Sequence, residues 1–197
     1  MEKLKKRPVA FLIAVLLVIG SLLFGVNRSL GQEVRAVEDQ FFTGVYDADR
    51  GFSRPSIHSQ LTRRATAALR ILSIGEHSHG EEASLQAPGV ELRAAREGLV
   101  DLLEAGASPR VLFQADQDLT AAVDRYYALL HPLAVIAQGE DLETLETEHE
   151  AMQNAARVIK ESGYNEAVGV FNRTVLGQFP LNILRGIVFV QPPELFA

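Results

Sequence analysis

Nineteen consecutive residues near the amino terminus, Pro8 to Val26, contain no charged side chain and only one hydroxyl group, on Ser21. As a helix they extend roughly 28 Å, close to the ~30 Å hydrocarbon core of a bilayer. Such a segment limits the folds open to the chain, because it needs either lipid or a large core around it. We expect a transmembrane helix over residues 8–26, which makes the bilayer the first predicted partner.

A cleaved signal peptide is the alternative interpretation of the same segment, with Ser29-x-Gly31 as the cleavage site. The apolar run exceeds the ~7–15 residues usual in signal peptides, and Arg28 adjoins the site, so an uncleaved anchor is favoured. Basic residues are concentrated before the segment. The positive-inside rule therefore places residues 1–7 in the cytoplasm and the rest of the chain outside the membrane. The preceding basic residues are Lys3, Lys5, Lys6 and Arg7.

Composition removes several classes of protein. The net charge is −6 although the first residues are basic, so the body is acidic and lacks the cationic surface that nucleic-acid binding requires. The chain has no cysteine, which excludes disulfides, thiolate metal sites and a lipid-anchored lipoprotein.

Helical periodicity dominates the body, and we predict an all-α fold, an antiparallel bundle of long helices over residues 27–179. The anchor helix is expected to continue to about Val45, followed by a turn at residues 47–51. Further helices are expected at 57–72, starting with a Ser53-Arg54-Pro55 cap, and at 92–102. A polar loop is expected at residues 75–89. Ser108-Pro109 predicts the start of a heptad-patterned helix, which Pro132 should break or kink.

The last predicted helix runs from about Glu140 to Gln178 and carries two aromatic–Asn pairs seven residues apart. Tyr164, Val168 and Phe171 form one apolar stripe, and Asn165 and Asn172 lie beside it. Two asparagines at heptad spacing favour interhelical hydrogen bonds that fix register. Phe179-Pro180 should end the helix, since proline has no amide N–H.

The order of these features resembles the LemA family. The resemblance is strongest in the aromatic-Asn repeat, the Phe-Pro pair and the final Pro-x-x-Phe; Gln60-Leu61-Thr62-Arg63-Arg64-Ala65 and His131-Pro132-Leu133 are similar to two further family elements. The family's proline after the Arg-Arg-Ala element is missing here. The residues that carry the resemblance are Gln60, Leu61, Arg63, Arg64, Pro132, Tyr164, Asn165, Val168, Phe171, Asn172, Phe179, Pro180, Asn182 and Phe196.

The resemblance implies a single-pass membrane protein whose helical bundle is a non-enzymatic scaffold or protein-interaction module. A protein partner is expected, and no cofactor or catalytic residue is predicted. A membrane-anchored ligand- or metal-responsive sensor remains the alternative, using the Glu76–Glu82 segment with His77 and His79. The acidic run from Glu140 to Glu150 is expected to be a solvated face near a helix N-terminus.

The carboxyl-terminal segment, residues 180–197, is too apolar for a free tail. Nine large apolar side chains between Leu181 and Phe196 would contribute on the order of 15 kcal/mol on burial, before entropy costs. A single basic residue, Arg185, is poor support for membrane binding. We therefore expect the segment to fold back onto the bundle.

Overall fold

A computed structural model describes residues 2–137, 140–178, 181 and 190–197, with the side chains of residues 2–10 and Glu140 left aside. Most of these residues are helical, which confirms the all-α prediction. The elements are α1 (Glu2–Thr43), β1 (Tyr46–Asp47), β2 (Phe52–Ser53), α2 (Ile57–His79), α3 (Ala83–Glu104), α4 (Pro109–Ala137), α5 (Glu140–Lys160), α6 (Tyr164–Phe171) and a π-helical turn, η1 (Asn172–Leu176).

The chain forms two compact units. The first consists of residues 1–38 and 168–193, and the second of residues 39–167 and 194–197. Both α1 and α6 pass from one unit to the other. The four carboxyl-terminal residues belong to the second unit, whereas the residues just before them belong to the first.

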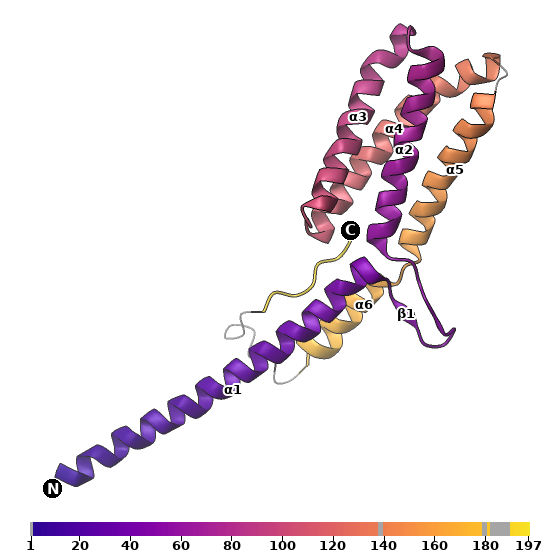
Figure 1. Cartoon of the computed structure of the whole chain (residues 1–197). Coiled ribbons are helices and arrows are strands. Elements are labelled where there is room, and N and C mark those ends of the chain that lie inside the picture. Colours follow the sequence, from indigo (N-terminus) through magenta and orange to yellow (C-terminus); the bar gives the residue numbers. More distant parts are fainter. Residues whose placement is uncertain (1, 138–139, 179–180, 182–189) are drawn as a thin grey trace. The chain divides into compact units, whose positions relative to one another are not determined.

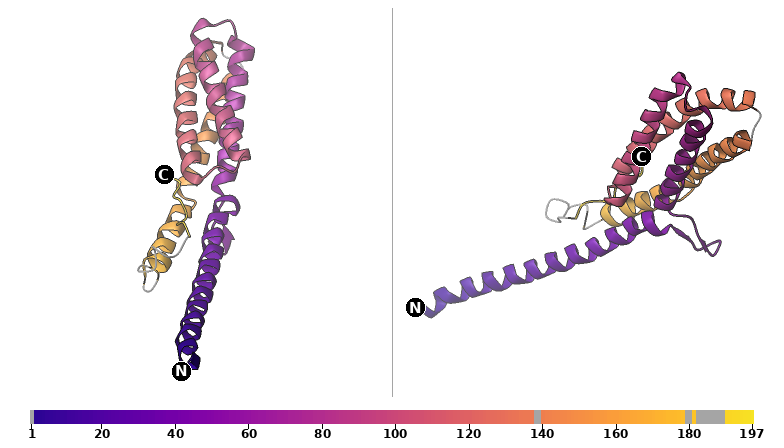
Figure 2. Two further views of the ribbon diagram at one scale, coloured as in Figure 1. Left: turned by 90° about the vertical axis from the view of Figure 1, so that its left-hand side faces the viewer. Right: turned by 45° about the horizontal axis from the view of Figure 1, so that its top comes forward.

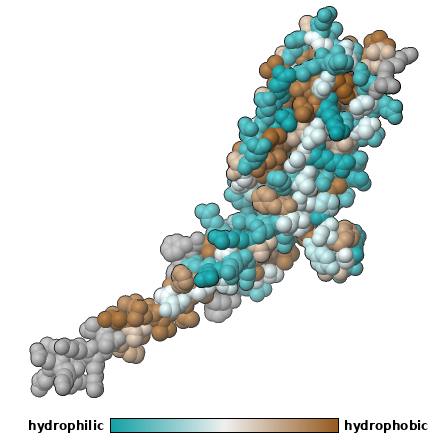
Figure 3. All heavy atoms as spheres, in the orientation of Figure 1, coloured by the Kyte–Doolittle hydropathy of each residue, from teal (hydrophilic) through white to brown (hydrophobic). Residues whose placement is uncertain are grey.

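The first unit contains the apolar part of α1. Phe11 and Leu17 are 72% and 66% exposed, and the segment forms a brown band on the surface in Figure 3. Among the described residues, α1 is the one helix long and apolar enough to cross a membrane. Farther along, Leu30 and Val34 pack against Phe171 and Leu176, so the end of α6 and η1 lie beside α1 (Figure 1).

The second unit is a bundle of α2, α3, α4 and α5, which run side by side in every view (Figures 1 and 2). Successive helices run in opposite directions, so neighbours in the sequence are antiparallel. α2 packs most closely against α5, and α3 against α4, whereas α4 and α5 make few contacts. The core between these four helices is mainly aliphatic, and its fully buried members include Leu61, Ile71, Leu92, Leu99, Leu119, Tyr126, Leu130 and Leu145.

The predicted loop at residues 75–89 is wrong. α2 continues to His79 and α3 already begins at Ala83, so only residues 80–82 separate the helices. Gly75 lies against Tyr126 so closely that a Cβ there would stand 2.0 Å from the phenol oxygen. Gly75 therefore lies inside a helix, and a glycine there leaves room for the Tyr126 ring across the bundle. It does not mark a turn. The third helix is accordingly much longer than residues 92–102.

Three further helix boundaries differ from expectation. Ser56, and not Ser53, caps α2 by accepting a hydrogen bond from the Ser59 amide (3.1 Å). Pro132 lies inside α4, which continues to Ala137; the proline costs one amide donor but does not end the helix. The long last helix is interrupted, since α5 ends at Lys160 and α6 begins at Tyr164.

The expected turn at residues 47–51 is present, as the turn of the β1–β2 hairpin between α1 and α2. Gly51 has φ +69°, and its amide donates to the Asp47 carbonyl (2.8 Å). Arg54 donates to the Asp47 carboxylate (2.8 Å) and to the Glu161 carbonyl (3.0 Å). This side chain ties the hairpin to the carboxyl-terminal end of α5.

Candidate functional site

The feature that brings the most predicted site residues together is the docked end of the chain. Asn165, at the start of α6, donates through Nδ2 to the Phe196 carbonyl (2.9 Å), and the Phe196 amide donates to Asn165 Oδ1 (2.8 Å). A side-chain amide thus pairs with both backbone groups of one residue, as a neighbouring strand would. The Tyr164 hydroxyl donates to the Glu194 carbonyl (2.9 Å). Three hydrogen bonds therefore hold residues 194–196 through their main chain.

Aromatic rings surround the Phe196 side chain, which is 5% exposed. Its ring centroid lies 5.2 Å from that of Phe113 in an edge-to-face arrangement and 5.9 Å from that of Phe41. Phe41 also meets Tyr164 edge-on at 5.5 Å. Such pairs contribute about 0.5–1.5 kcal/mol each beyond the burial of their area. We call the site formed by Phe41, Phe113, Tyr164 and Asn165 the tail slot.

The break between α5 and α6 places Tyr164 and Asn165 in the slot. Gly163 adopts φ +80°, a conformation that ends a helix and that other residues avoid. The buried Ser162 hydroxyl accepts a hydrogen bond from the Tyr164 amide (3.4 Å), and the Gly163 carbonyl accepts one from Ala167 (2.9 Å). The chain therefore restarts as a helix at Tyr164, and the first aromatic–Asn pair occupies its first turn.

A cavity of about 390 Å³ adjoins the slot, between α4 and α5, with Phe113, Asn165 and Phe196 in its wall. Arg64, from α2, is 3% exposed and lies 2.7 Å (Nε to Oδ1) from Asp116, which is 9% exposed. This is an ion-pair contact without the angles of a directional hydrogen bond. Burial raises the pKa of the Asp116 carboxyl, and its effect exceeds the lowering by Arg64.

Other predicted site residues are divided between the units. On α2, Gln60, Leu61 and Arg64 are buried and Arg63 is exposed. Val168 and Phe171 are buried in the first unit, as the stripe predicts. Phe179, Pro180 and Asn182 lie outside the described residues.

The remaining predicted site residues are the two asparagines, expected to bond between helices, and Pro132. Among the described residues, neither asparagine forms the expected hydrogen bond to a neighbouring helix: Asn165 binds the tail, and Asn172 Oδ1 is buried without a hydrogen-bond partner. Pro132 is exposed on α4 and does not line the cavity beside the tail slot.

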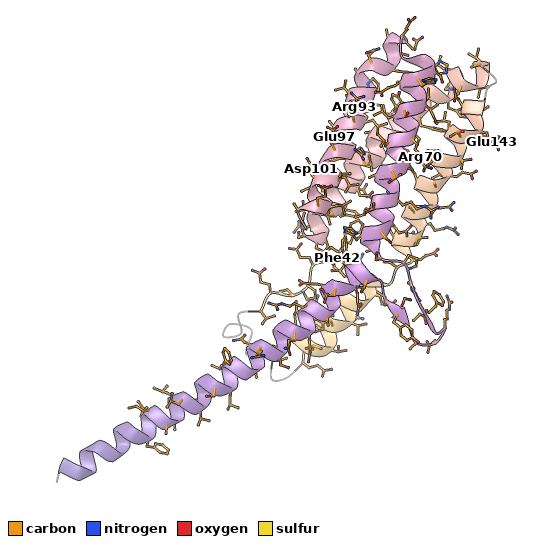
Figure 4. The ribbon with its side chains drawn as sticks, in the orientation of Figure 1. Phe42, Arg70, Arg93, Glu97, Asp101 and Glu143 are labelled. Atoms are coloured by element: carbon orange, nitrogen blue, oxygen red, sulfur yellow. The ribbon has the colours of Figure 1, made fainter. Side chains whose placement is uncertain are left out.

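The Glu76–Glu82 segment does not form a metal-ligand cluster, since the described residues contain no group of three or more His, Cys, Asp or Glu side chains able to hold an ion. Glu76 instead pairs with Arg93, on the outer face of α3 where Glu97 and Asp101 also lie (Figure 4). His79 lines a separate cavity of about 120 Å³ beside Tyr126.

The acidic run at the start of α5 is only partly a solvated face. Glu143 is exposed (Figure 4). Glu148 is 8% exposed, and its carboxylate forms an ion pair with the guanidinium of Arg70 on α2 at 2.5 Å. His149 stacks on Tyr127 with ring centroids 3.8 Å apart and planes 11° apart. A buried carboxylate and a stacked imidazole thus fill the seam between α5 and its neighbours.

The residues that sequence reasoning missed are Phe41, Phe113 and Asp116. Phe41 appeared only as one apolar position in a helical pattern, and nothing local marks Phe113 or Asp116. Comparison with models of protein families, with curated proteins and with solved structures finds no match.

Proposed function

We propose that this chain is a LemA-like, single-pass membrane protein whose bundle is a non-enzymatic protein-interaction module. The observation that carries the proposal is the tail slot, where the bundle holds a short non-helical peptide through its main chain and one aromatic anchor. Main-chain pairing supplies affinity and a side-chain pocket supplies selectivity in many peptide-binding domains. The partner we propose is a protein with an exposed segment that presents an aromatic side chain.

The family assignment is supported by the meeting of three motif residues. Tyr164 and Asn165 belong to the first aromatic–Asn pair, and Phe196 ends the Pro-x-x-Phe element thirty-one positions later. Residues this far apart in sequence share one site, which gives the resemblance a physical basis. The exposed apolar part of α1 supports the membrane anchor, and the positive-inside rule supports a cytoplasmic amino terminus.

The chain's own tail occupies the slot, so a partner segment must exchange with it. This arrangement allows two changes with opposite effects. Truncation after Pro193 empties the slot and should increase partner binding, whereas Asn165→Ala in the truncated chain removes the main-chain contacts and should reduce it again. A scaffold that binds partners elsewhere on its surface would respond to neither change.

Proximity labelling in cells tests the proposal. The labelling enzyme should be inserted at the exposed α3–α4 turn near Gly106, because a fusion at Ala197 would disturb the tail. A chain limited to residues 1–38 serves as the membrane control. We expect a partner set absent from this control, enriched by truncation after Pro193 and depleted again when Asn165→Ala is added to the truncated chain. Identical sets for the full chain and the control would contradict an interaction module. Protease accessibility of the inserted tag in intact cells tests the orientation.

A further inference from the structure

The cavity beside the tail slot is lined by charged, polar and apolar side chains. α4 and α5 make few contacts with each other, and the cavity lies in the gap they leave, with Arg64 from α2 at its lining. Its volume, about 390 Å³, falls within the ~300–1,000 Å³ of small-molecule sites. All of its lining residues belong to the second unit.

The buried Arg64 guanidinium has more N–H groups than it has contacts among the described residues. Nε contacts Asp116, one terminal nitrogen donates to the Met152 carbonyl (3.3 Å), and the other donates to the Thr120 hydroxyl. Among the described residues, two hydrogen bonds and one ion-pair contact therefore engage a guanidinium that has five N–H groups. A group buried this deeply favours further acceptors, because water reaches it poorly.

The charges of the lining favour an anion. Two cations, Arg64 and Lys160, face one carboxylate, that of Asp116, so one positive charge remains. This net positive charge would repel a cationic ligand. A polyanion would carry more negative charge than the lining neutralises. The rest of the lining is partly polar and partly apolar, with Gln117, Thr120 and Asn165 beside Phe113, Ala156, Ile159 and Phe196.

We propose that this cavity binds a small amphipathic monoanion, a carboxylate carried on a short aromatic or hydrocarbon body. The carboxylate meets the Arg64–Lys160 side, and the body lies against Phe113, Ile159 and Phe196. The proposal does not depend on the protein-interaction function, because it needs neither a partner nor release of the tail.

Three probes with one body and different charges test it on the full chain in lipid nanodiscs, with empty nanodiscs as the blank. The probes are 3-phenylpropanoate, 3-phenylpropan-1-ol and 3-phenylpropylammonium, followed by ligand-observed NMR titration. We expect saturable binding of the anion, at least tenfold tighter than binding of the alcohol, and no saturable binding of the cation. Equal binding of the three probes, or no saturable binding of the anion at millimolar concentration, would overturn the proposal.

Two matched pairs of variants locate the bound anion without removing Arg64, whose loss threatens folding. Ala156→Leu fills the cavity and should weaken anion binding at least tenfold, whereas Ala151→Leu on the same helix should not. Lys160→Met should weaken the anion severalfold and leave the alcohol unchanged, with Arg157→Met as the control. Circular dichroism verifies that each variant is folded. Anion binding that survives Ala156→Leu in a folded protein would place the ligand elsewhere and refute the assignment.

Discussion

The two aromatic–Asn pairs are nearly identical in sequence and differ completely in what they contact. Tyr164 and Phe171 are both buried, at 0% and 7% exposure, so the aromatic positions behave alike. The asparagines do not. The Asn165 side-chain amide hydrogen-bonds to the main chain of Phe196, whereas Asn172 has a buried Oδ1 without a hydrogen-bond partner among the described residues.

The difference arises from the chain around each pair. The first pair opens a helix after Gly163, and the returning tail covers it. The second lies where α6 passes into the π-helical turn η1, in the other unit. Heptad spacing therefore conserves which residues face inward but not what their polar neighbours bind. The carboxyl terminus makes one of two similar pairs a binding site.

Phe196→Ala should have the largest effect on this comparison, because it removes the aromatic anchor of the tail. Large-to-small substitution of a buried Phe costs about 3–5 kcal/mol, more than a four-residue segment is expected to retain. We expect release of the tail, measured as loss of hydrogen-exchange protection at the residue 196 amide. Leu195→Ala is the control, since Leu195 is 45% exposed. Full protection in Phe196→Ala would mean that main-chain hydrogen bonds alone hold the tail.

Asn165→Ala should have the next largest effect and Asn172→Ala almost none. Loss of two hydrogen bonds to Phe196 should lower the free energy of tail opening by about 2 kcal/mol. Asn172 Oδ1 has no such bond to lose. Asn165→Asp sharpens the test, because a carboxylate accepts from the Phe196 amide but cannot donate to its carbonyl, so a loss smaller than that of Asn165→Ala is expected. Exchange at the Phe196 amide reports all three variants. Equal effects at positions 165 and 172 would contradict the contrast between the pairs.

Local patterns predicted the helical class, the turn at residues 47–51, the start of α4 at Pro109 and the burial of Tyr164, Val168 and Phe171. Each depends on spacing or capping within a few residues, which the sequence displays directly. Helix continuity through Gly75 and Pro132 was harder to foresee. Gly75 is buried against Tyr126, a residue fifty-one positions away, and tertiary packing overrides the local preference of glycine for turns.

The site was less predictable than the fold. The motif identified Tyr164, Asn165 and Phe196 as notable, but no spacing rule joins α6 to the last residues of the chain. Apolar periodicity also continued across Ser162 and Gly163, which hid the helix break that aims Asn165 at the tail. Arg64 and Asp116 lie on different helices, so their ion pair depends on the bundle being assembled first.

Gly163→Ala tests whether the break before the first pair is required, since the second pair has no such break. The φ of +80° at this position costs an L-residue about 1–2 kcal/mol. A Cβ would also stand 3.3 Å from the Arg54 guanidinium, which binds the end of α5. We expect a lower melting temperature and weaker protection at Phe196. Gly163→Asn should lose less, because asparagine tolerates this region better. An unchanged melting temperature for Gly163→Ala would show that α5 and α6 can join without cost.

Among the changes within the tail slot, Tyr164→Phe should have the smallest effect, although it makes the two pairs identical in sequence. The substitution removes the hydrogen bond to the Glu194 carbonyl and keeps the ring that Phe41 contacts edge-on. We expect tail opening to become easier by about 1 kcal/mol, roughly half the effect of Asn165→Ala. Hydrogen exchange at the Phe196 amide measures both losses on one scale. If Tyr164→Phe released the tail completely, the hydroxyl would be the principal contact and Asn165 an accessory one. The expected small loss would instead mean that two Phe-Asn pairs, alike in every side chain, still differ because the tail returns to only one of them.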